Sequence, residues 1–238
     1  MPKHKLARFA ELGTFNNVIQ PEKGIHFGKD HPIKDNWKKV IFRNENPLIL
    51  ELGCGKGEYT IGLSSRFPQN NFIGIDIKGA RLWSGARTAH ENRQPNVAFL
   101  RTRIEFINSF FSENEVDEIW ITFPDPHPGK NNSNKRLTCP WFLNTYRNFL
   151  KDNGIIHLKT DNKELFEYTK KLAGKNGLEI LAATNDLYSD NTINEILSIK
   201  THYEKIFLKE GVKITYLAFR LKKEKIITDG PLQEKNGK

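Results

Sequence analysis

Short runs of apolar residues alternate along this chain with longer stretches in which apolar and polar positions recur at the spacing of a helix. The apolar runs predict strands. They cover residues 48–52, 72–77, 97–100, 116–123, 154–159, 178–183 and 212–221. The stretches 138–150 and 162–173 predict helices, and in the second Leu165, Tyr168 and Leu172 share one face. Strands that alternate with helices require right-handed crossovers, so the pattern predicts an α/β fold built on a mostly parallel sheet.

The regular alternation ends after the run at 178–183. A loop-rich insertion at about 184–200 and a short helix at 201–210 separate that run from the last one. We therefore predict a mostly parallel seven-stranded sheet with an irregular or antiparallel edge and helices on both faces. Ligands of such sheets bind beyond the carboxyl ends of the strands.

Composition divides the chain into three segments. Residues 1–35 are polar, basic and interrupted by glycine and proline, so we predict a basic N-terminal arm that packs loosely or becomes ordered on binding. Residues 36–221 are predicted to form one domain with a single sizeable core. Residues 222–238 read as a polar C-terminal tail.

An excess of basic residues is the first indication of function. The 238 residues include 37 Lys and Arg against 28 Asp and Glu, which gives a formal net charge of +9. Basic residues recur in the segments 3–8, 130–136 and 200–213. This distribution suits a polyanion such as nucleic acid, and solvated surface lysine is the alternative interpretation.

Other features of the composition narrow the class of protein. No apolar stretch approaches the ~20 residues that span a bilayer, and the first residues lack the apolar core of a signal peptide. Cys54 and Cys139 are the two cysteines, and the seven histidines do not fall at the spacing of zinc ligands. We therefore expect a cytoplasmic protein without a disulfide framework, a metal site or a membrane partner.

A glycine-rich turn follows the first predicted strand. Glu51 precedes Gly53, Gly55 and Gly57, and glycines at alternate positions let the backbone turn tightly and let a ligand approach. The third glycine comes one residue too early for the dinucleotide fingerprint, so the spacing favours S-adenosylmethionine over NAD. Asp76, at the end of the second strand, is placed to accept the two ribose hydroxyls of either cofactor. An ordinary glycine-rich turn and a solvated acid at a strand end are the alternatives.

After the third strand we expect an acidic residue that binds the edge of the adenine, but the sequence has none at that position. Arg103, Ile104 and Glu105 are the candidate contacts there. Either Arg103 covers the adenine or the backbone of this segment binds its edge.

The fourth predicted strand ends at a carboxylate between two prolines, Pro124-Asp125-Pro126. Prolines on both sides stiffen the backbone and lower the entropic cost of placing the Asp125 side chain. Asp161 ends the fifth strand, so two acids from neighbouring strands are expected to face one crevice. For Asp161, capping of the helix that follows is the alternative role.

Taken together, these motifs resemble the bacterial tRNA (guanine-N7)-methyltransferase family. They are LELGCGKGEYT, FIGIDI, FPDPHPGK with KRLT after it, GIIHLKTDN and THYE, in this order between about Leu48 and Leu221. The resemblance implies a Rossmann-like class I methyltransferase fold, S-adenosyl-L-methionine as cofactor, and methylation of a guanine in the variable loop of tRNA, at position 46. It leaves open whether the enzyme is a monomer or a homodimer.

The resemblance also implies roles for individual residues. Glu51 and Asp76 correspond to cofactor contacts, and Asp125 corresponds to the acid at the active centre, beside the cofactor. The implied substrate contacts are Lys130, Asp161, Thr201, His202, Tyr203 and Glu204.

This sequence departs from the usual pattern of the family in two places. Arg103 stands where aspartate is frequent, which leaves adenine recognition open. The lysine after the Asp-Pro pair is displaced to Lys130, so Lys135 and Arg136 are alternative substrate contacts. The segment 201–204 also has the spacing of a helix capping box, which is a second interpretation of its Thr and Glu.

Guanine N7 carries an in-plane lone pair and no proton, so its methylation needs placement rather than a general base. Positive charge develops on the purine, and a fixed carboxylate stabilises it, which is the role we predict for Asp125. A methyltransferase for exocyclic base nitrogens would show an Asp/Asn-Pro-Pro-aromatic run that this chain lacks. A small-molecule methyltransferase and a non-catalytic RNA-binding protein on the same fold are the remaining alternatives.

Overall fold

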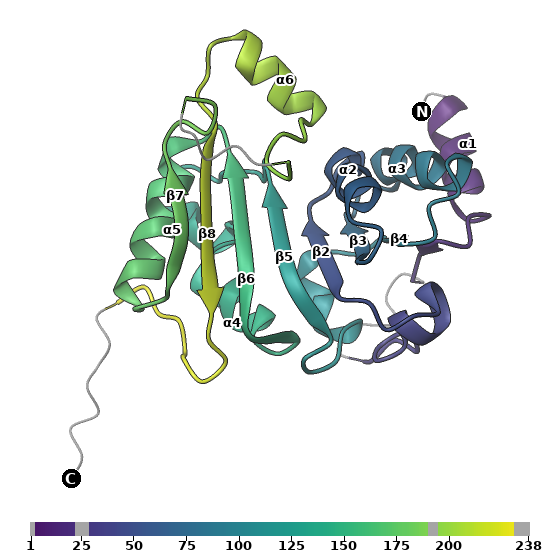
Figure 1. Cartoon of the computed structure of the whole chain (residues 1–238), viewed down its shortest axis with the longest axis horizontal. Helices are drawn as coiled ribbons and strands as arrows, with labels where there is room; N and C mark the ends of the chain where they lie inside the picture. The colour runs from purple at the N-terminus through teal and green to yellow at the C-terminus, as the bar shows by residue number, and fades with distance from the viewer. Residues whose placement is uncertain (1–2, 22–28, 190–194, 231–238) are drawn as a thin grey trace.

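The computed structural model describes residues 3–21, 29–189 and 195–230 (Figure 1). Its centre is one eight-stranded sheet with the order β1-β4-β3-β2-β5-β6-β8-β7. The strands are β1 (Val18–Ile19), β2 (Leu48–Leu52), β3 (Asn71–Ile75), β4 (Val97–Leu100), β5 (Val116–Thr122), β6 (Leu150–Thr160), β7 (Ile180–Thr184) and β8 (Thr215–Leu221). Each of the seven predicted strands is present.

An α-helix or a shorter helical turn separates each strand from the next along the chain. The α-helices are α1 (Lys3–Leu12), α2 (Glu58–Arg66), α3 (Gly79–Glu91), α4 (Pro140–Tyr146), α5 (Lys163–Lys175) and α6 (His202–Lys209). Three shorter helical turns complete the described elements: η1 (Trp37–Phe42), η2 (Ile104–Ser109) and η3 (Lys130–Lys135).

The sheet is parallel from β1 through β6, and β8 runs antiparallel to both of its neighbours, β6 and β7. The predicted antiparallel edge is therefore confirmed. The eighth strand is β1, which pairs Val18 and Ile19 with Phe99 and Leu100 of β4. Two residues are too few to show the alternation of a strand, so the sequence predicted seven strands instead of eight.

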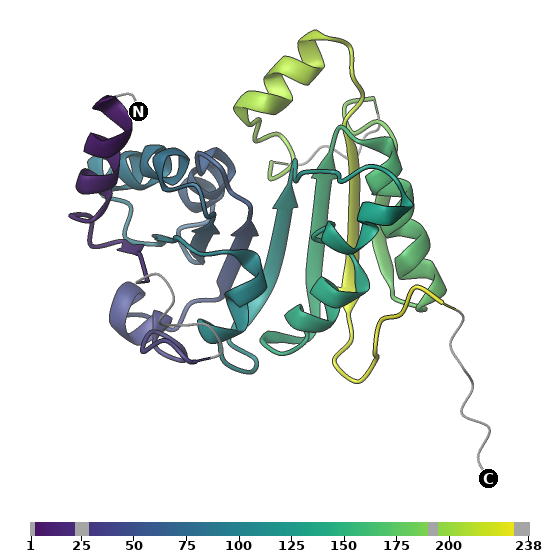
Figure 2. The same cartoon turned by 180° about the vertical axis from the view of Figure 1, so that it is seen from behind.

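Helices cover both faces of the sheet. In Figure 1, α2 and α3 lie in front of β2, β3 and β4, with α1 packed on α3. Figure 2 shows α4 and α5 on the opposite face, over β5, β6 and β8. All residues of β2, β3 and β4 are buried, as expected for parallel strands that are covered on both faces. The predicted fold class is confirmed.

The described part of the N-terminal segment packs against the domain. Leu12 is fully buried and Phe15 nearly so, in a cluster with Leu82 and Ala86 of α3. Near the other end of the chain, Ile227 is buried against the main core. The division into arm, domain and tail stays a prediction, and residues 231–238 of the tail lie outside the described residues.

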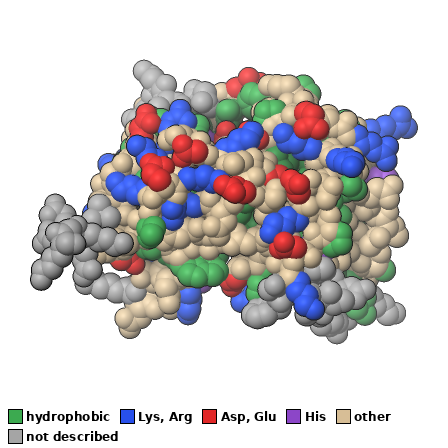
Figure 3. All heavy atoms as spheres, turned by 90° about the horizontal axis from the view of Figure 1, so that it is seen from below, with side chains coloured by type: hydrophobic (Ala, Val, Ile, Leu, Met, Phe, Trp, Pro, Cys, Tyr) green, Lys and Arg blue, Asp and Glu red, His purple; other side chains and the backbone are tan. Residues whose placement is uncertain are grey.

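Three findings concern membrane spans, metal ligands and surface charge among the described residues. No helix among them is both long enough and apolar enough to cross a membrane. Within residues 3–21, 29–189 and 195–230, no three His, Cys, Asp or Glu side chains gather as metal ligands. Seen from the amino-terminal ends of the parallel strands, acidic and basic side chains are interspersed on the surface (Figure 3).

Candidate active site

A cavity of about 680 Å³ lies at the carboxyl ends of the central strands. Eight of the predicted site residues line this cavity: Gly53, Asp76, Arg103, Ile104, Glu105, Asp125, Asp161 and Tyr203. They come from the turns after β2, β3, β4, β5 and β6 and from α6. A smaller hollow of about 90 Å³ shares Gly53, Asp76 and Tyr203 with the cavity and extends along Gly55 and Thr201. The fold therefore brings the predicted cofactor and substrate residues together, at the place where open parallel sheets bind ligands.

The three glycines of the turn after β2 are all left-handed, with φ values of 73° at Gly53, 57° at Gly55 and 72° at Gly57. A Cβ atom at Gly55 would have no atom within 4 Å, so this backbone borders open space that a ligand can fill. At Gly57 a Cβ atom would lie 2.7 Å from the ring of Phe99. The glycines thus serve two needs, because Gly55 leaves room for a ligand and Gly57 allows α2 to pack closely on β4.

Asp76, one residue after β3, fixes the shape of the glycine turn. Its Oδ2 accepts a hydrogen bond of 2.9 Å from the backbone N–H of Gly55, and its Oδ1 accepts one of 2.7 Å from that of Lys78. Each carboxylate oxygen keeps a lone pair for a further donor. Asp76 is therefore placed both to hold the turn and to accept ribose hydroxyls.

Glu51, in β2, lies beneath the turn rather than on the lining of either hollow. It is 3 % exposed and accepts hydrogen bonds from the N–H of Thr60 at 2.8 Å, the hydroxyl of Thr122 at 2.6 Å, and the hydroxyl of Thr60. Burial raises the pKa of its carboxyl group from 4.5 to about 7, and the threonine donors oppose that shift. Direct contact of Glu51 with a cofactor stays a prediction.

The segment that follows β4 presents its backbone and Ile104 to the cavity. Arg103 and Glu105 both line it, and they form an ion pair of 2.9 Å with each other at its exposed edge. Ile104, the first residue of η2, also lines the cavity and is packed in the main core, so it supplies an apolar wall.

Asp125 lines the cavity on a short segment that lies between two residues with left-handed backbone. Phe123 and His127 have left-handed φ values of 48° and 42°. The carboxylate of Asp125 is 76 % exposed, and its nearest described partner is the backbone N–H of His127 at 3.4 Å. Its hydrogen-bonding capacity is therefore largely available to a bound substrate.

Arg136 holds the backbone of the segment that carries Asp125. Its guanidinium donates hydrogen bonds to the carbonyl of Pro126 at 3.1 Å and to that of His127 at 3.1 and 3.2 Å. It also forms an ion pair of 2.5 Å with Glu164 of α5 and lies over the ring of Tyr168. The side chain of Arg136 is 3 % exposed and holds the segment that carries Asp125; its predicted role as an alternative substrate contact stays a prediction.

Lys135 of the same segment differs from Arg136 in its exposure. Lys135 is exposed, and its one described hydrogen bond is to the side chain of Asn132 at 3.1 Å. Lys130 is the first residue of η3. Their predicted contacts with substrate stay predictions.

Asp161 follows β6 and is half-buried at the cavity, where burial raises the pKa of its carboxyl group. Asn162, not Asp161, caps the helix that follows, because the Asn162 side chain accepts a hydrogen bond of 2.8 Å from the N–H of Leu165. Asp161 is thus left facing the cavity that Asp125 also lines.

The segment 201–204 divides its residues between two tasks. Thr201 and Glu204 form both hydrogen bonds of a capping box at the start of α6, so the structural interpretation of this pair is confirmed. Glu204 is fully buried, whereas Tyr203 is 47 % exposed and lines the cavity. The backbone N–H of His202 donates to Glu58 at 2.7 Å.

The sequence reasoning missed several residues of the site. Phe123 and Phe207 line the cavity and stack with ring centroids 6.1 Å apart. Phe207 lies four residues after Tyr203 on the same helix, a spacing that places both side chains on one face and could have indicated it. Arg81 of α3 also lines the cavity, and no signal in the sequence distinguishes it from other exposed arginines.

The chain matches known proteins over most of its length. A family model described as a putative methyltransferase matches residues 45–217. The tRNA (guanine-N(7)-)-methyltransferase of Bacteroides fragilis is 47% identical over 94% of this chain and 88% of its own length. The enzyme of the same name from Porphyromonas gingivalis is 52% identical over 88% of this chain and 86% of its own length. This chain belongs to the tRNA (guanine-N(7)-)-methyltransferase family.

Solved structures agree on the fold. The crystal structure of a 16S rRNA methyltransferase, KamB, has a TM-score of 0.61 at 12% identity, over 81% of this chain and 95% of that one. An antibiotic-related methyltransferase has a TM-score of 0.56 at 18% identity, over 76% and 89%. At these identities the likeness shows the class I methyltransferase fold alone.

Membership in a methyltransferase family confirms the predicted cofactor, S-adenosylmethionine. The described residues fit it on two observations. The open space beside Gly55 adjoins a cavity large enough for a ligand of this size, and the carboxylate of Asp76 stands at the end of β3 beside that space. Gly53, Gly55 and Asp76 would hold the cofactor, with Ile104 against its apolar part.

Proposed function

We propose that this enzyme transfers the methyl group of S-adenosylmethionine to N7 of a guanine in the variable loop of tRNA, at position 46. The observation that carries the proposal is the convergence of the glycine turn, Asp76, Asp125 and Asp161 on one cavity, in a chain of the tRNA (guanine-N(7)-)-methyltransferase family. The position in the variable loop rests on the resemblance of the motifs.

The acceptor atom determines what the protein has to supply. Guanine N7 has a free lone pair, so the site needs orientation and exclusion of water rather than a base. S-adenosylmethionine, when bound, supplies an electrophilic methyl group. Asp125 accepts hydrogen bonds from the N1–H and N2–H edge of the guanine, and these bonds strengthen as the purine gains positive charge. Bound RNA removes water from the exposed carboxylate, which strengthens the same interaction.

The apolar side of the cavity suits a base that has left its stack. Tyr203, Phe207 and Phe123 line it together, and aromatic side chains are the usual platform for an unstacked base. Extrusion of the base costs a few kcal/mol, which stacking on such rings offsets in part. Asp161 is the second acid of this pocket.

Exposed lysines near the cavity are placed to bind the phosphates of the folded RNA. Lys135 lies on η3, and Lys205 and Lys209 lie on α6. Phosphate contacts of this kind give affinity that falls with salt, while the choice of base is made in the pocket.

The test is to incubate the protein with an unmodified tRNA transcript and labelled S-adenosylmethionine, and to locate the methyl group by borohydride reduction and aniline cleavage. We expect cleavage at one guanine of the variable loop, and none in a matched transcript that has adenine at that position. A label at another purine would overturn the proposal. A protein that binds the transcript without labelling it would instead be the non-catalytic RNA-binding protein.

A further inference from the structure

A lysine lies fully buried near the carboxyl end of β6. Lys159 and Glu204 are both 0 % exposed, and the Lys159 Nζ lies 2.8 Å from Oε1 and 3.0 Å from Oε2 of Glu204. The same ammonium group donates to the backbone carbonyls of Leu197 at 2.9 Å and Ile199 at 3.0 Å. The three N–H bonds of the lysine therefore all have partners in the segment that leads into α6.

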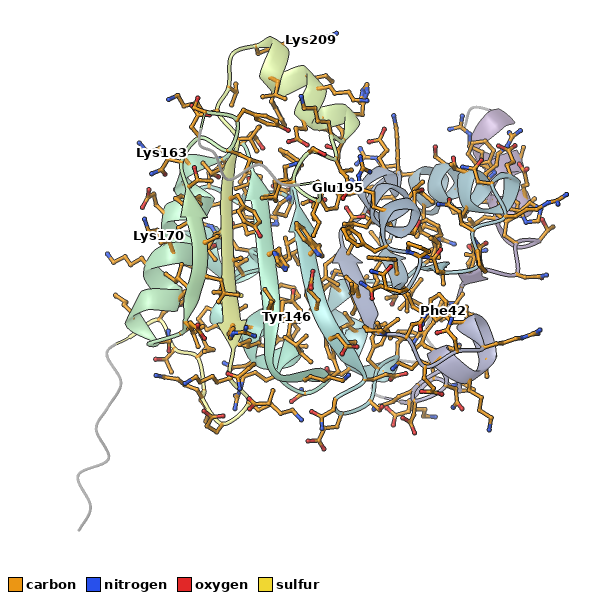
Figure 4. The ribbon with its side chains drawn as sticks, in the orientation of Figure 1. Phe42, Tyr146, Lys163, Lys170, Glu195 and Lys209 are labelled. Carbon is orange, nitrogen blue, oxygen red and sulfur yellow. The ribbon has the colours of Figure 1, made fainter. Side chains whose placement is uncertain are left out.

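Glu204 extends the network to the insertion between β7 and α6. Its Oε1 accepts a hydrogen bond of 2.6 Å from the hydroxyl of Tyr188, and its Oε2 accepts one of 3.3 Å from the N–H of Thr201. One carboxylate thus joins β6, the insertion and the first turn of α6. In Figure 4, Glu195 marks the start of the described part of this segment, near the ends of the strands, and Lys209 projects from the far end of α6.

The network lies directly behind the substrate side of the cavity. Lys159 lies on β6, two residues before Asp161, which follows that strand, and Glu204 is the neighbour of Tyr203, which lines the cavity. Phe207 follows on the same helix and stacks on Phe123, next to the prolines that flank Asp125. The position of α6 over the cavity therefore depends on where Glu204 is held.

Burial of two charges is costly, and an apolar pair of similar volume would hold the helix with equal or greater stability. An ion pair differs from an apolar contact in that it accepts only a narrow range of geometries. Burial lowers the pKa of Lys159, and the nearby Glu204 opposes that shift. The pair is thus better suited to set a position than to add stability.

We propose that Lys159 is a positioning residue for methyl transfer, which holds α6 through Glu204 so that Tyr203 and Phe207 complete the guanine pocket. This inference rests on the proposed function for its substrate. It also gives Glu204 a role inside the protein in place of the RNA contact that the sequence predicted.

The test is the double variant Lys159→Met/Glu204→Gln, which removes both charges and leaves neither of them unpaired. The amide oxygen introduced by Glu204→Gln can still accept a hydrogen bond from the hydroxyl of Tyr188. The matched control is Lys223→Met/Glu113→Gln, which removes an ion pair of 2.6 Å whose glutamate is 75 % exposed, outside the cavity lining. The single variant Lys159→Met leaves Glu204 buried without a counter-ion, so it serves only as a check on folding.

Two measurements separate positioning from general stability. Hydrogen exchange of the amides of 202–209 should become faster in the double variant, while α2 and α5 keep their protection. The kcat/KM for tRNA should fall by about 10- to 100-fold, as expected for a displaced binding wall, with the affinity for S-adenosylhomocysteine nearly unchanged. The control variant should match the wild type in both measurements.

Two results would overturn the inference: wild-type kcat and KM for tRNA in the double variant, or unchanged exchange in α6. A wild-type protein that does not methylate guanine N7 would refute the proposed function instead. Hydrogen exchange would still report whether Lys159 and Glu204 hold α6, because it requires no substrate.

Discussion

The two halves of the active site are held in place by different means. In the cofactor half, residues 48–105, carboxylates of the sheet hold backbone N–H groups: Asp76 accepts from Gly55 and Glu51 accepts from Thr60. The further donor to Glu51, the hydroxyl of Thr122, lies on β5, the strand paired with β2. In the substrate half, residues 116–209, ion pairs between side chains far apart in sequence hold the site in place. Arg136 pairs with Glu164, 28 residues on, and Lys159 with Glu204, 45 residues on. The cofactor half is thus set once the sheet forms, whereas the substrate half depends on individual side chains.

Two carboxylates show the same contrast. Glu51 is buried with a pKa raised to about 7, and it has threonine donors on both sides. Asp125 is largely exposed, and its described partners are long contacts to His127, at 3.4 Å to the backbone N–H and 4.0 Å to Nδ1 of the ring. The hydrogen-bonding capacity of Glu51 is used within the folded protein, whereas Asp125 gains its main partners only when substrate binds.

The largest effect is expected at Asp125 in the substrate half. Asp125→Asn keeps the size of the side chain but removes the charge that stabilises the methylated purine, so kcat should fall by about 100- to 1,000-fold. Titration calorimetry with S-adenosylhomocysteine should show an affinity close to that of the wild type. Asp30→Asn, at an exposed aspartate paired with Lys34, is the control and should leave both quantities unchanged.

A variant of Asp125 with near-normal turnover would show that the exposed carboxylate is not the catalytic group. Loss of cofactor affinity in the same variant would instead show that the two halves are not independent. Either outcome would break the comparison.

In the cofactor half, the largest effect is expected on the pH dependence of stability. The folded protein holds the proton of Glu51 up to a pKa of about 7, against 4.5 for the ordinary carboxyl, so the folded state binds more protons across that interval. Stability contributed by the protonated form is therefore present below pH 4.5 and is lost as the pH rises through 7. The loss amounts to about 3 kcal/mol for the cofactor-free protein.

Glu51→Gln removes this titration and keeps the shape of the side chain. Urea unfolding of wild type and variant at pH 5 and pH 8 measures the difference, since the other titrating groups are common to both proteins. The free energy of unfolding should fall more between these pH values in the wild type than in the variant. Equal changes in the two proteins would mean that Glu51 is not held protonated.

The sequence predicted the cofactor half better than the substrate half, for a physical reason. The strands at 48–52 and 97–100 were predicted to the residue, because parallel strands that are buried on both faces are continuously apolar. β6 was predicted to begin at 154, but it begins at Leu150, since Lys151, Asp152 and Asn153 are exposed and interrupt the pattern.

The contacts that place the substrate half were not predictable from the pattern. Nothing in the sequence pairs Arg136 with Glu164, and Arg136 was predicted as an alternative substrate contact because the lysine of the family motif is displaced in this chain. One signal was present and unused: Lys159 stands inside an apolar strand, and a lysine there needs a partner.

The next effect concerns two neighbours in the substrate half, Arg136 and Lys135. Arg136→Met should lower kcat about tenfold, because the segment that carries Asp125 loses its clamp. The salt dependence of tRNA binding should stay as in the wild type. Lys135→Met should leave kcat unchanged and should reduce the slope of log affinity against log salt by about 1.

Filter binding across a range of salt concentrations, together with single-turnover rates, measures both quantities. A smaller slope for Arg136→Met would support the substrate contact that the sequence predicted for Arg136. An unchanged slope for Lys135→Met would remove that lysine from the RNA interface.

The smallest effect is expected from a pair of glycines, one in each half. Gly55 and Gly129 have φ values of 57° and 83°, and a Cβ atom at either would meet nothing within 4 Å. Alanine should therefore be strained at both, by about 1 to 3 kcal/mol in the free energy of unfolding, and more strongly at Gly129, whose ψ of 155° places it in a region that is essentially restricted to glycine. Only Gly55→Ala places its methyl group in the space for the cofactor, so calorimetry should show affinity for S-adenosylhomocysteine that is weaker by about fivefold in this variant alone. Equal affinities in the two variants would mean that the backbone of the turn does not border the cofactor, and the contrast between the two halves would then rest on side chains alone.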